Sequence, residues 1–222
     1  MKKTNVAVGV IIALGVIWTG AAWFTGKQLE SHMDELVQNA NTQLNALAPN
    51  SRLKLSYQDY QRGVFSSTAK LVLQANSQTE DNAFLKPGQS IVFNETIDHG
   101  PFPFAQLRRF TLIPSMASVH TELENTDALK NLFALTDNKS PANADTRIGY
   151  SGATDTALHF LPVNYQNAQT GQRVATNGGT LNVSADSKGD KVSVDSDIDS
   201  IAITSKNEMG MPVLFTANGV KV

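Results

Sequence analysis

The stretch LNALAPNSRLKLSY, residues 44–57, contains the point at which the hydrophobic pattern of the chain changes. Before Pro49, apolar residues recur with the spacing of an α-helix. After Pro49 they alternate with polar residues, as Leu53, Leu55 and Tyr57 do, which is the period of a β-strand. Since proline disfavours helical conformation in the residue before it, the helix is expected to end here. The sequence therefore predicts a helical N-terminal part followed by a β-rich body.

Upstream of this point, residues 25–49 are predicted to form an amphipathic helix. Its apolar residues form one stripe, opposite a polar face: Leu29, Met33, Leu36, Val37, Ala40, Leu44 and Leu47. We favour packing of this stripe on the protein's own sheet. A coil formed with a second copy of the chain and a helix lying on the membrane surface are the alternatives, although the polar face carries little of the positive charge that anionic lipid attracts.

Residues 6–24 form an uncharged, mainly apolar run of 19 residues that ends in Trp23 and Phe24. A helix of this length spans about 28 Å, close to the roughly 30 Å of a bilayer's hydrocarbon core. Lys2 and Lys3 precede the run, and this basic excess favours a cytoplasmic N-terminus over residues 1–5. The run is predicted to be a single-pass transmembrane anchor, and a signal peptide cleaved near residue 22 is the alternative.

Downstream, residues 50–222 are predicted to form an antiparallel β-rich domain on the periplasmic side. Strands are expected at 53–57, 64–73, 89–97, 107–119, 147–160, 179–184, 191–194, 198–204 and 213–216, with a hairpin turn at 187–190, a loop at 137–145 and one helix at 127–135 capped by Asn125 or Thr126. The fold class is α+β: a transmembrane helix and an amphipathic helix followed by a mostly antiparallel meander. Because the last strand has no following turn, we expect a natural chain that is longer; a short natural chain is the alternative.

Composition excludes several functional classes. The chain of 222 residues has no Cys, which excludes disulfides and thiol chemistry, and its net charge of −2 argues against a nucleic-acid partner. No phosphate loop, nucleophile elbow or zinc-binding helix occurs, so no catalytic residue, metal site or cofactor is predicted. Asp195, Asp197 and Asp199 imitate the start of a calcium loop, but the required glycine and terminal glutamate are missing.

Two short motifs supply the candidate binding residues, Arg62, Phe65 and His99. Arg62 precedes Gly63 and can brace backbone carbonyls or a carboxylate such as Asp59, or bind an anion or a lipid headgroup. His99 opens a rigid Gly-Pro-Phe-Pro turn over residues 100–103. On a strand Asp98 and His99 point to opposite faces, so they are not expected to form a catalytic pair.

The run Tyr57-Gln-Asp-Tyr-Gln-Arg-Gly-Val-Phe-Ser-Ser67, the anchor run and residues 97–103, Ile-Asp-His-Gly-Pro-Phe-Pro, resemble the YdgA family of bacterial envelope proteins. The likeness is best over residues 1–103, and Tyr150-Ser151-Gly152 adds a weaker match. The resemblance implies one N-terminal helix in the inner membrane, a large periplasmic part and a full length of roughly twice this chain. It implies no catalytic residue, because the family is uncharacterised.

The expected role is non-enzymatic: a membrane-anchored periplasmic protein whose sheet is a binding or assembly surface. The expected partners are the lipid bilayer, other envelope proteins, lipid, or a second copy in a homodimer. The alternative is a lipid-handling module in which the strands curve around an apolar groove.

Overall fold

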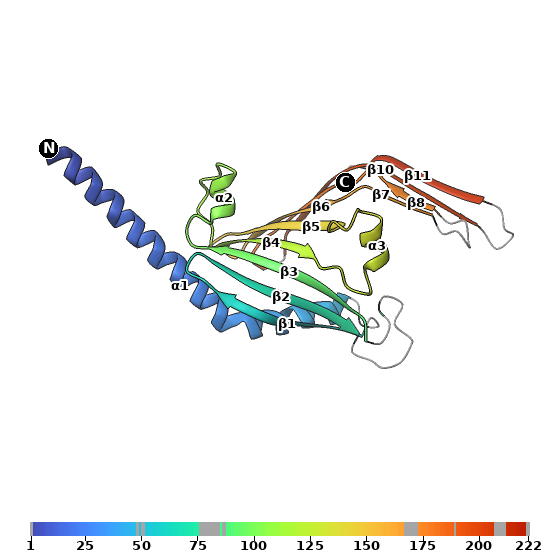
Figure 1. Cartoon of the computed structure of the whole chain (residues 1–222), viewed down its shortest axis with the longest axis horizontal. Coiled ribbons are helices and arrows are strands. Elements are labelled where there is room, and N and C mark those ends of the chain that lie inside the picture. The colour runs from blue at the N-terminus through green and yellow to red at the C-terminus, as the bar shows by residue number, and fades with distance from the viewer. Residues whose placement is uncertain are drawn as a thin grey trace.

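The computed structural model of the chain describes residues 2–47, 49, 52–75, 85, 88–166, 173–188, 190–206 and 212–220. Within these ranges side chains are described except at residues 2–14, 47, 199, 201, 205–206, 212–215 and 217–220. A long helix, a curved sheet and two short helices make up the molecule (Figure 1).

The described chain begins with a single helix, α1 (Lys2–Leu47), where two adjoining segments, 6–24 and 25–49, were predicted. No proline occurs within it, and it ends two residues before Pro49 because that ring restricts its predecessor. Within the part of the chain that the structure describes, no helix combines enough length with enough apolarity to cross a bilayer. Residues 6–14, which begin the predicted anchor, lie outside the described side chains.

The described strands form one sheet of eleven, in the order β1-β2-β3-β4-β5-β6-β9-β10-β8-β7, with β11 paired to β10. All of these pairings are antiparallel, as predicted. The strands are β1 (Leu53–Arg62), β2 (Ser66–Ala75), β3 (Ser90–His99), β4 (Ala117–Leu123), β5 (Ala142–Ile148), β6 (Thr154–Phe160), β7 (Val163–Gln166), β8 (Arg173–Thr176), β9 (Gly179–Ala185), β10 (Val192–Lys206) and β11 (Pro212–Val220).

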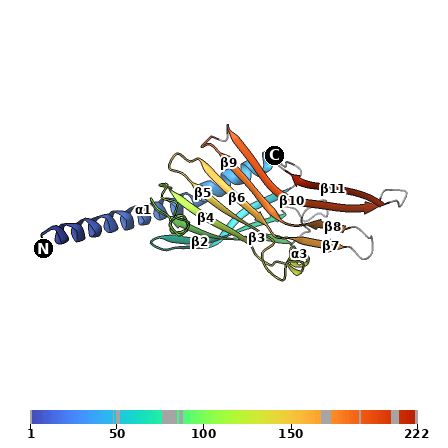
Figure 2. The ribbon, with the colours of Figure 1, turned by 90° about the horizontal axis from the view of Figure 1, so that it is seen from above.

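Strand β10 is one continuous strand where two were predicted. Its first half, Val192–Ile198, pairs with β9, and its second half pairs with β8 and β11. The ladder of β7, β8, β10 and β11 therefore extends away from the rest of the sheet (Figures 1 and 2).

The predicted strand 107–119 is wrong for its first ten residues. Residues Phe104–Arg108 form helix α2, a loop follows, and β4 begins only at Ala117. Pro103 stands at the N-terminus of α2 with φ −56°, a favourable start for a helix, and Pro114 cannot donate to a strand ladder. The break expected near Pro114 lies in this loop, and several apolar residues of the segment are exposed.

The predicted strand 147–160 is a hairpin. The Gly149 N–H donates to the Ala153 carbonyl at 2.9 Å, and Gly152 has φ +85°, so the chain reverses between β5 and β6. The predicted loop 137–145 therefore ends earlier, at the start of β5. The hairpin predicted around residues 187–190 is confirmed by the antiparallel pairing of β9 and β10, and Gly189 lies outside the described residues.

The predicted helix 127–135 is shorter, because only α3 (Lys130–Ala134) is helical and its N-terminus has no side-chain cap. Thr126, one of the two predicted caps, instead donates its hydroxyl to the Ser90 carbonyl at 2.8 Å. Phe133 anchors α3 in the core with 4% exposure.

The second part of α1 packs along β1, as favoured from the sequence. Met33 is buried, and most of the described stripe is partly buried, although Leu36 is half exposed. The Asn41 side chain receives the Leu55 N–H at 2.7 Å and donates to the Leu55 carbonyl at 2.8 Å. One amide thus makes both hydrogen bonds to the β1 backbone that a neighbouring strand would make.

Replacement of that amide should weaken the contact between α1 and β1. Asn41→Ala leaves a partly buried N–H and carbonyl of Leu55 without their partner, at a cost of about 1–3 kcal/mol. We expect a lower unfolding midpoint and faster hydrogen exchange at the Leu55 amide. Asn45→Ala, an exposed position one turn further along α1, is the matched control. Equal exchange at Leu55 in the two variants would contradict the assignment.

Candidate functional site

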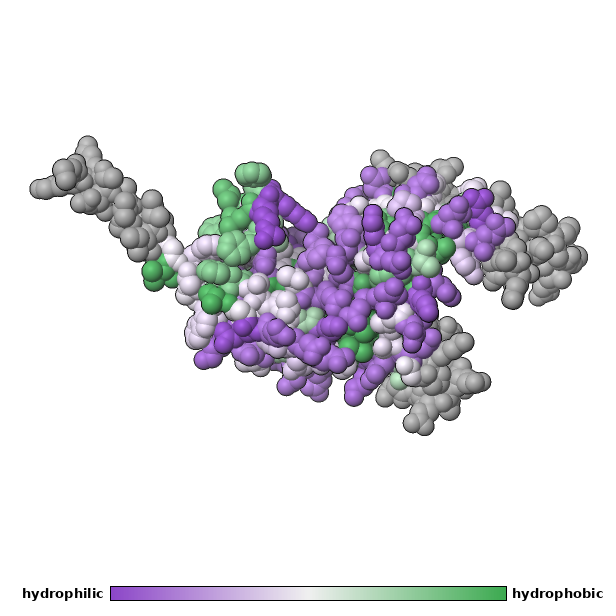
Figure 3. Space-filling view, viewed as in Figure 1, coloured by the Kyte–Doolittle hydropathy of each residue, from purple (hydrophilic) through white to green (hydrophobic). Residues whose placement is uncertain are grey.

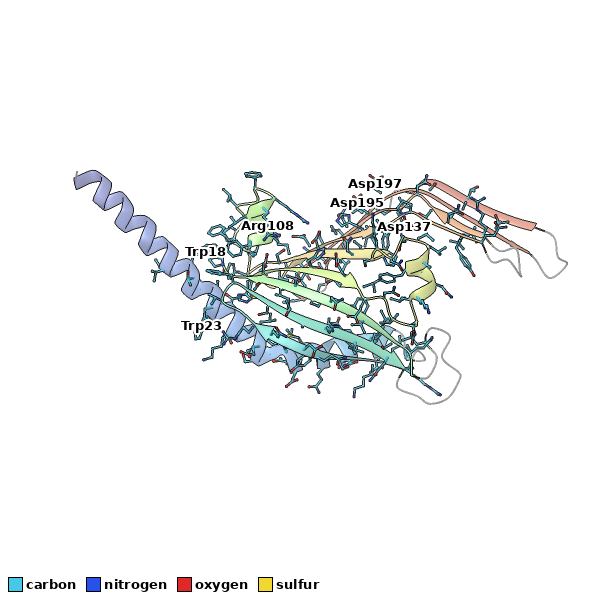
Figure 4. All side chains as sticks on the ribbon, viewed as in Figure 1. Trp18, Trp23, Arg108, Asp137, Asp195 and Asp197 are labelled. Carbon is cyan, nitrogen blue, oxygen red and sulfur yellow. The ribbon has the colours of Figure 1, made fainter. Side chains whose placement is uncertain are left out.

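The three candidate residues come from different elements and converge on α1. Arg62 ends β1, Phe65 lies in the turn before β2, and His99 ends β3. All three contact α1 between residues 18 and 30. Figure 4 marks this part of the helix by Trp18 and Trp23. The candidate site is thus the joint between helix and sheet, and we call it the helix clamp.

His99 is the centre of the helix clamp. Its ring is 2% exposed, its Nδ1 lies 2.8 Å from the Ala22 carbonyl of α1, and its Nε2 lies 3.1 Å from the Ser67 hydroxyl. A carbonyl only accepts, so Nδ1 carries the proton, and the neutral Nε2 accepts from Ser67. Tyr60 in turn donates to Ser67 at 3.3 Å. Burial lowers the pKa of His99, against the opposing effects of its bond to Ala22 and of the nearby Asp98 carboxylate.

Two glycines let the helix approach this closely. A Cβ on Gly26 would lie 2.5 Å from the His99 ring, and one on Gly100 would lie 2.7 Å from the Ala22 side chain. Gly100 also has φ +113°, a conformation that residues with a side chain rarely adopt. Ala22 itself is fully buried. The fit depends on small residues on both sides of the joint.

Arg62 binds the helix and not Asp59, the carboxylate considered from the sequence. Its Nε donates to Glu30 at 2.8 Å, and its guanidinium lies 5.6 Å from the centre of the Trp23 ring. Lys27 lies over the same ring at 5.5 Å. Asp59 adopts φ +55° at the bulge in β1, between the paired residues Gln58 and Gln61.

Phe65 belongs to an aromatic cluster. Its ring centre lies 5.1 Å from that of Trp18 in α1 and 5.3 Å from that of Phe104, the first residue of α2, and Trp18 and Phe104 are also 5.1 Å apart. These are ordinary packing distances for aromatic rings. The cluster therefore joins α1, the β1–β2 turn and α2.

Ser67 and His99 resemble a nucleophile and its base in distance alone. Ser67 is 1% exposed and His99 2%, so both side chains are enclosed where α1 meets the sheet. Asp98 points away from His99, as predicted, and accepts the Ala105 N–H of α2 at 2.8 Å. The arrangement fixes a helix on a sheet; it is not exposed for chemistry.

The remaining candidates lie apart from the helix clamp. Asp195 and Asp197 are exposed on β10, and the side chain of Asp199 lies outside the described residues. Among the described residues no three acidic or histidine side chains are grouped to hold a metal ion. His120 on β4 bonds Asp145 at 2.7 Å, and Asp145 also pairs with Arg109 at 2.6 Å.

Sequence reasoning missed Glu30 and Gly26, and it did not connect Ser67 with His99. Glu30 and Arg62 are separated by 32 residues, as are Ser67 and His99, so no local spacing connects them. One sequence signal could have identified Gly26. It is an isolated glycine inside a helical pattern, and such a glycine often marks the close approach of another element.

Filling the space at Gly26 should push α1 away from the sheet. Gly26→Ala places a methyl group against the His99 ring, and overpacking of this kind costs about 1–3 kcal/mol. The matched control is Gly20→Ala in the same helix, where nothing lies within 4 Å of the added carbon. We expect a lower midpoint of thermal unfolding for Gly26→Ala and an unchanged or higher one for Gly20→Ala. Equal midpoints would show that the helix does not depend on the close approach.

The helix clamp should weaken in acid. Because the pKa of His99 is lowered in the folded state, its contribution is complete above the ordinary value of 6.5 and is lost as pH falls through the lower folded value. Hydrogen bonds to Asp145 and Glu122 outweigh burial and raise the pKa of His120, which gives the opposite slope. The informative quantity is therefore the difference between wild type and His99→Asn, which keeps a donor near Nδ1 but does not titrate. We expect the unfolding midpoint of the wild type to fall more steeply between pH 7.5 and 5; parallel curves would exclude His99 as the cause.

The sequence matches known bacterial proteins along its whole length. A family described as "Bacterial protein of unknown function (DUF945)" matches residues 1–222. Protein YdgA of Escherichia coli is 45% identical over 221 residues, which are 100% of this chain and 43% of that protein. The uncharacterized protein YihF of Escherichia coli is 32% identical over 78% of this chain and 36% of its own length.

An uncharacterized protein of Haemophilus influenzae is 25% identical over 77% of this chain and 45% of its own length. The chain thus spans less than half the length of the curated relatives it matches. No solved structure matches the chain. The family match over every residue and the identity to YdgA agree with the resemblance of the N-terminal motifs, and the chain therefore belongs to the DUF945 family of YdgA-like bacterial proteins.

Proposed function

We propose that the chain is a bacterial envelope protein, held in the inner membrane by residues 6–24, whose sheet is a non-enzymatic binding or assembly surface in the periplasm. The uncharged run of residues 6–24 and the preceding Lys2 and Lys3 support the anchor and its orientation. A helical backbone throughout this run supports it further, because a helix satisfies its own polar groups in lipid.

The helix clamp is the observation that carries the proposal. Its contacts extend from Trp18 through Ala22 and Gly26 to Glu30 and so include the last turns of the uncharged run. A sheet attached in this way has a set height and tilt relative to the anchor, unlike a domain on a flexible linker. That geometry suits a surface that presents partners at the membrane, and it needs no catalytic group.

The ladder of β7, β8 and β10 is the part of the sheet best placed for a partner. It extends away from α1 (Figure 2) and exposes the apolar side chains of Tyr165, Val174 and Ile203. Apolar residues gathered on an exposed ladder are typical of a protein–protein contact. An envelope protein or a second copy of the chain is the expected occupant.

A lipid-handling role is the second candidate, because an apolar cavity lies beside this ladder. Its volume is about 460 Å³ and its walls come from α3, β6, β7, β8 and β10, including Leu132, Phe160 and Val174. The cavity is the size of a small ligand site. Lipid that co-purifies with the wild type and is lost from Leu132→Glu, as measured by mass spectrometry, would favour this role over the first.

The anchor can be tested by fractionation and topology reporters. We expect the full chain to resist carbonate extraction, and alkaline phosphatase fused after Val222 to be active while a fluorescent protein stays dark. Ile11→Lys with Ile12→Lys should release the chain, since each lysine at mid-bilayer costs roughly 3 kcal/mol. Leu36→Lys, on an exposed position of the same helix, is the control. A fluorescent C-terminus, or a mature chain beginning near Trp23, would overturn the anchor.

The binding surface can be tested by photo-crosslinking in intact cells. A photoreactive residue at Tyr165 should capture an envelope protein or a second copy, and one at Glu35, on the exposed face of α1, is the control. Capture of lipid alone from position 165 would replace the assembly role with the lipid-handling one.

A further inference from the structure

The loop that follows α2 exposes a compact apolar tip. Phe110 is 93% exposed, Leu112 71% and Ile113 55%, and we call these three residues the α2 tip. In Figure 3 hydrophobic colour gathers over α2 on a face that is otherwise largely hydrophilic. So much apolar surface on a short loop normally marks a contact with another surface.

The exposure of the α2 tip is built into the backbone. Phe110 has φ +55°, a conformation that is costly for a bulky residue and persists only where the surroundings impose it. The Phe110 N–H donates to the Leu107 carbonyl at 3.0 Å, and the Thr111 N–H donates to the Gln106 carbonyl at the same distance. The loop is therefore held in this form by its own hydrogen bonds.

Three strands fasten α2 beneath the tip. Asp98 of β3 accepts the Ala105 N–H, the buried Gln106 donates to Ser118 of β4, and Arg109 pairs with Asp145 of β5. With its polar groups bonded to the sheet, α2 cannot turn its apolar residues inward without breaking these contacts. The tip is thus a fixed projection of the sheet.

The α2 tip lies at the level of the proposed anchor's last turns. Phe104, the first residue of α2, packs against Trp18, which stands six residues before the end of the uncharged run. Six residues correspond to about 9 Å along a helix axis. Trp18 and the α2 helix with Arg108 lie side by side at the same end of the molecule (Figures 1 and 4). If residues 6–24 span the bilayer, α2 stands at its outer boundary.

Basic side chains beside the tip and at the end of the uncharged run suit lipid headgroups. Arg108 is exposed, and among the described residues it has no ion-pair partner, while Lys27 and Arg62 lie over Trp23 at the end of the uncharged run. Basic side chains next to exposed aromatic and aliphatic ones are the composition of membrane-surface contacts.

We propose that the α2 tip is a second membrane contact, in which Phe110, Leu112 and Ile113 enter the outer-leaflet interface of the bilayer that holds residues 6–24, with Arg108 at the phosphates. This inference rests on the proposed anchor. With two contacts, an anchor and a tip joined by the helix clamp, the sheet cannot rotate freely about the axis of α1.

Spin labels can test the proposal, because the absence of Cys from the chain allows single cysteines to be labelled without background. The full chain is reconstituted in vesicles of phosphatidylethanolamine and phosphatidylglycerol, and each label is compared for collision with oxygen and with a water-soluble nickel chelate. Labels are placed at Phe110→Cys in the tip, at Val16→Cys in the proposed anchor and at Leu36→Cys, an exposed position further along α1, as the control.

We expect oxygen to dominate over the chelate at positions 16 and 110, and the chelate to dominate at position 36. An added Leu112→Asp with Ile113→Asp should reverse the ratio at position 110 and leave position 16 unchanged. Lipid access at 16 with water access at 110 would overturn the tip alone, whereas water access at both would overturn the anchor. A label at 110 shielded from both reagents would indicate a protein contact and also overturn the proposal.

Discussion

The contact between the His99 ring and the Ala22 carbonyl is the constraint on which the rest of the structure depends. It joins the C-terminal end of β3 to the middle of a helix 77 residues earlier in the chain. The bond is made inside the protein, where an unsatisfied N–H on the His99 ring would be expensive, so its geometry is strongly enforced. Gly26 and Gly100 permit the approach, and Arg62, Phe65 and their partners surround it.

The contacts at this joint give the three candidate binding residues a structural role. Arg62, Phe65 and His99 are spread over three elements, yet all serve one purpose, the attachment of α1. A histidine in a rigid turn and an arginine before a glycine are compatible with ligand binding or with structure. Here both ring nitrogens of His99 and the Nε of Arg62 form hydrogen bonds within the chain. Exposed apolar side chains lie elsewhere, at the ladder of β7, β8 and β10 and at the α2 tip.

Elements that depend on local pattern could be predicted, and contacts that depend on distant residues could not. The alternation of Leu53, Leu55 and Tyr57 predicted β1, and the periodic apolar residues after Gly26 predicted the second part of α1. The prediction of a strand over residues 107–116 was wrong because Phe110 and Leu112 alternate with polar residues as in a strand but are exposed to solvent. Periodicity alone does not show whether apolar residues are buried. The pairing of Arg62 with Glu30 could not be predicted, because the two residues are 32 positions apart in the sequence.

The hydrogen bonds between Asn41 and Leu55 also affect the tendency of this chain to aggregate. Strand β1 is the edge strand on its side of the sheet. The unpaired backbone groups of an edge strand can pair with a strand of another molecule, which is a first step toward aggregation. Here the amide of Asn41 already occupies the N–H and carbonyl of Leu55, and the body of α1 lies alongside. The same helix that positions the sheet thereby protects this edge from the addition of a further strand.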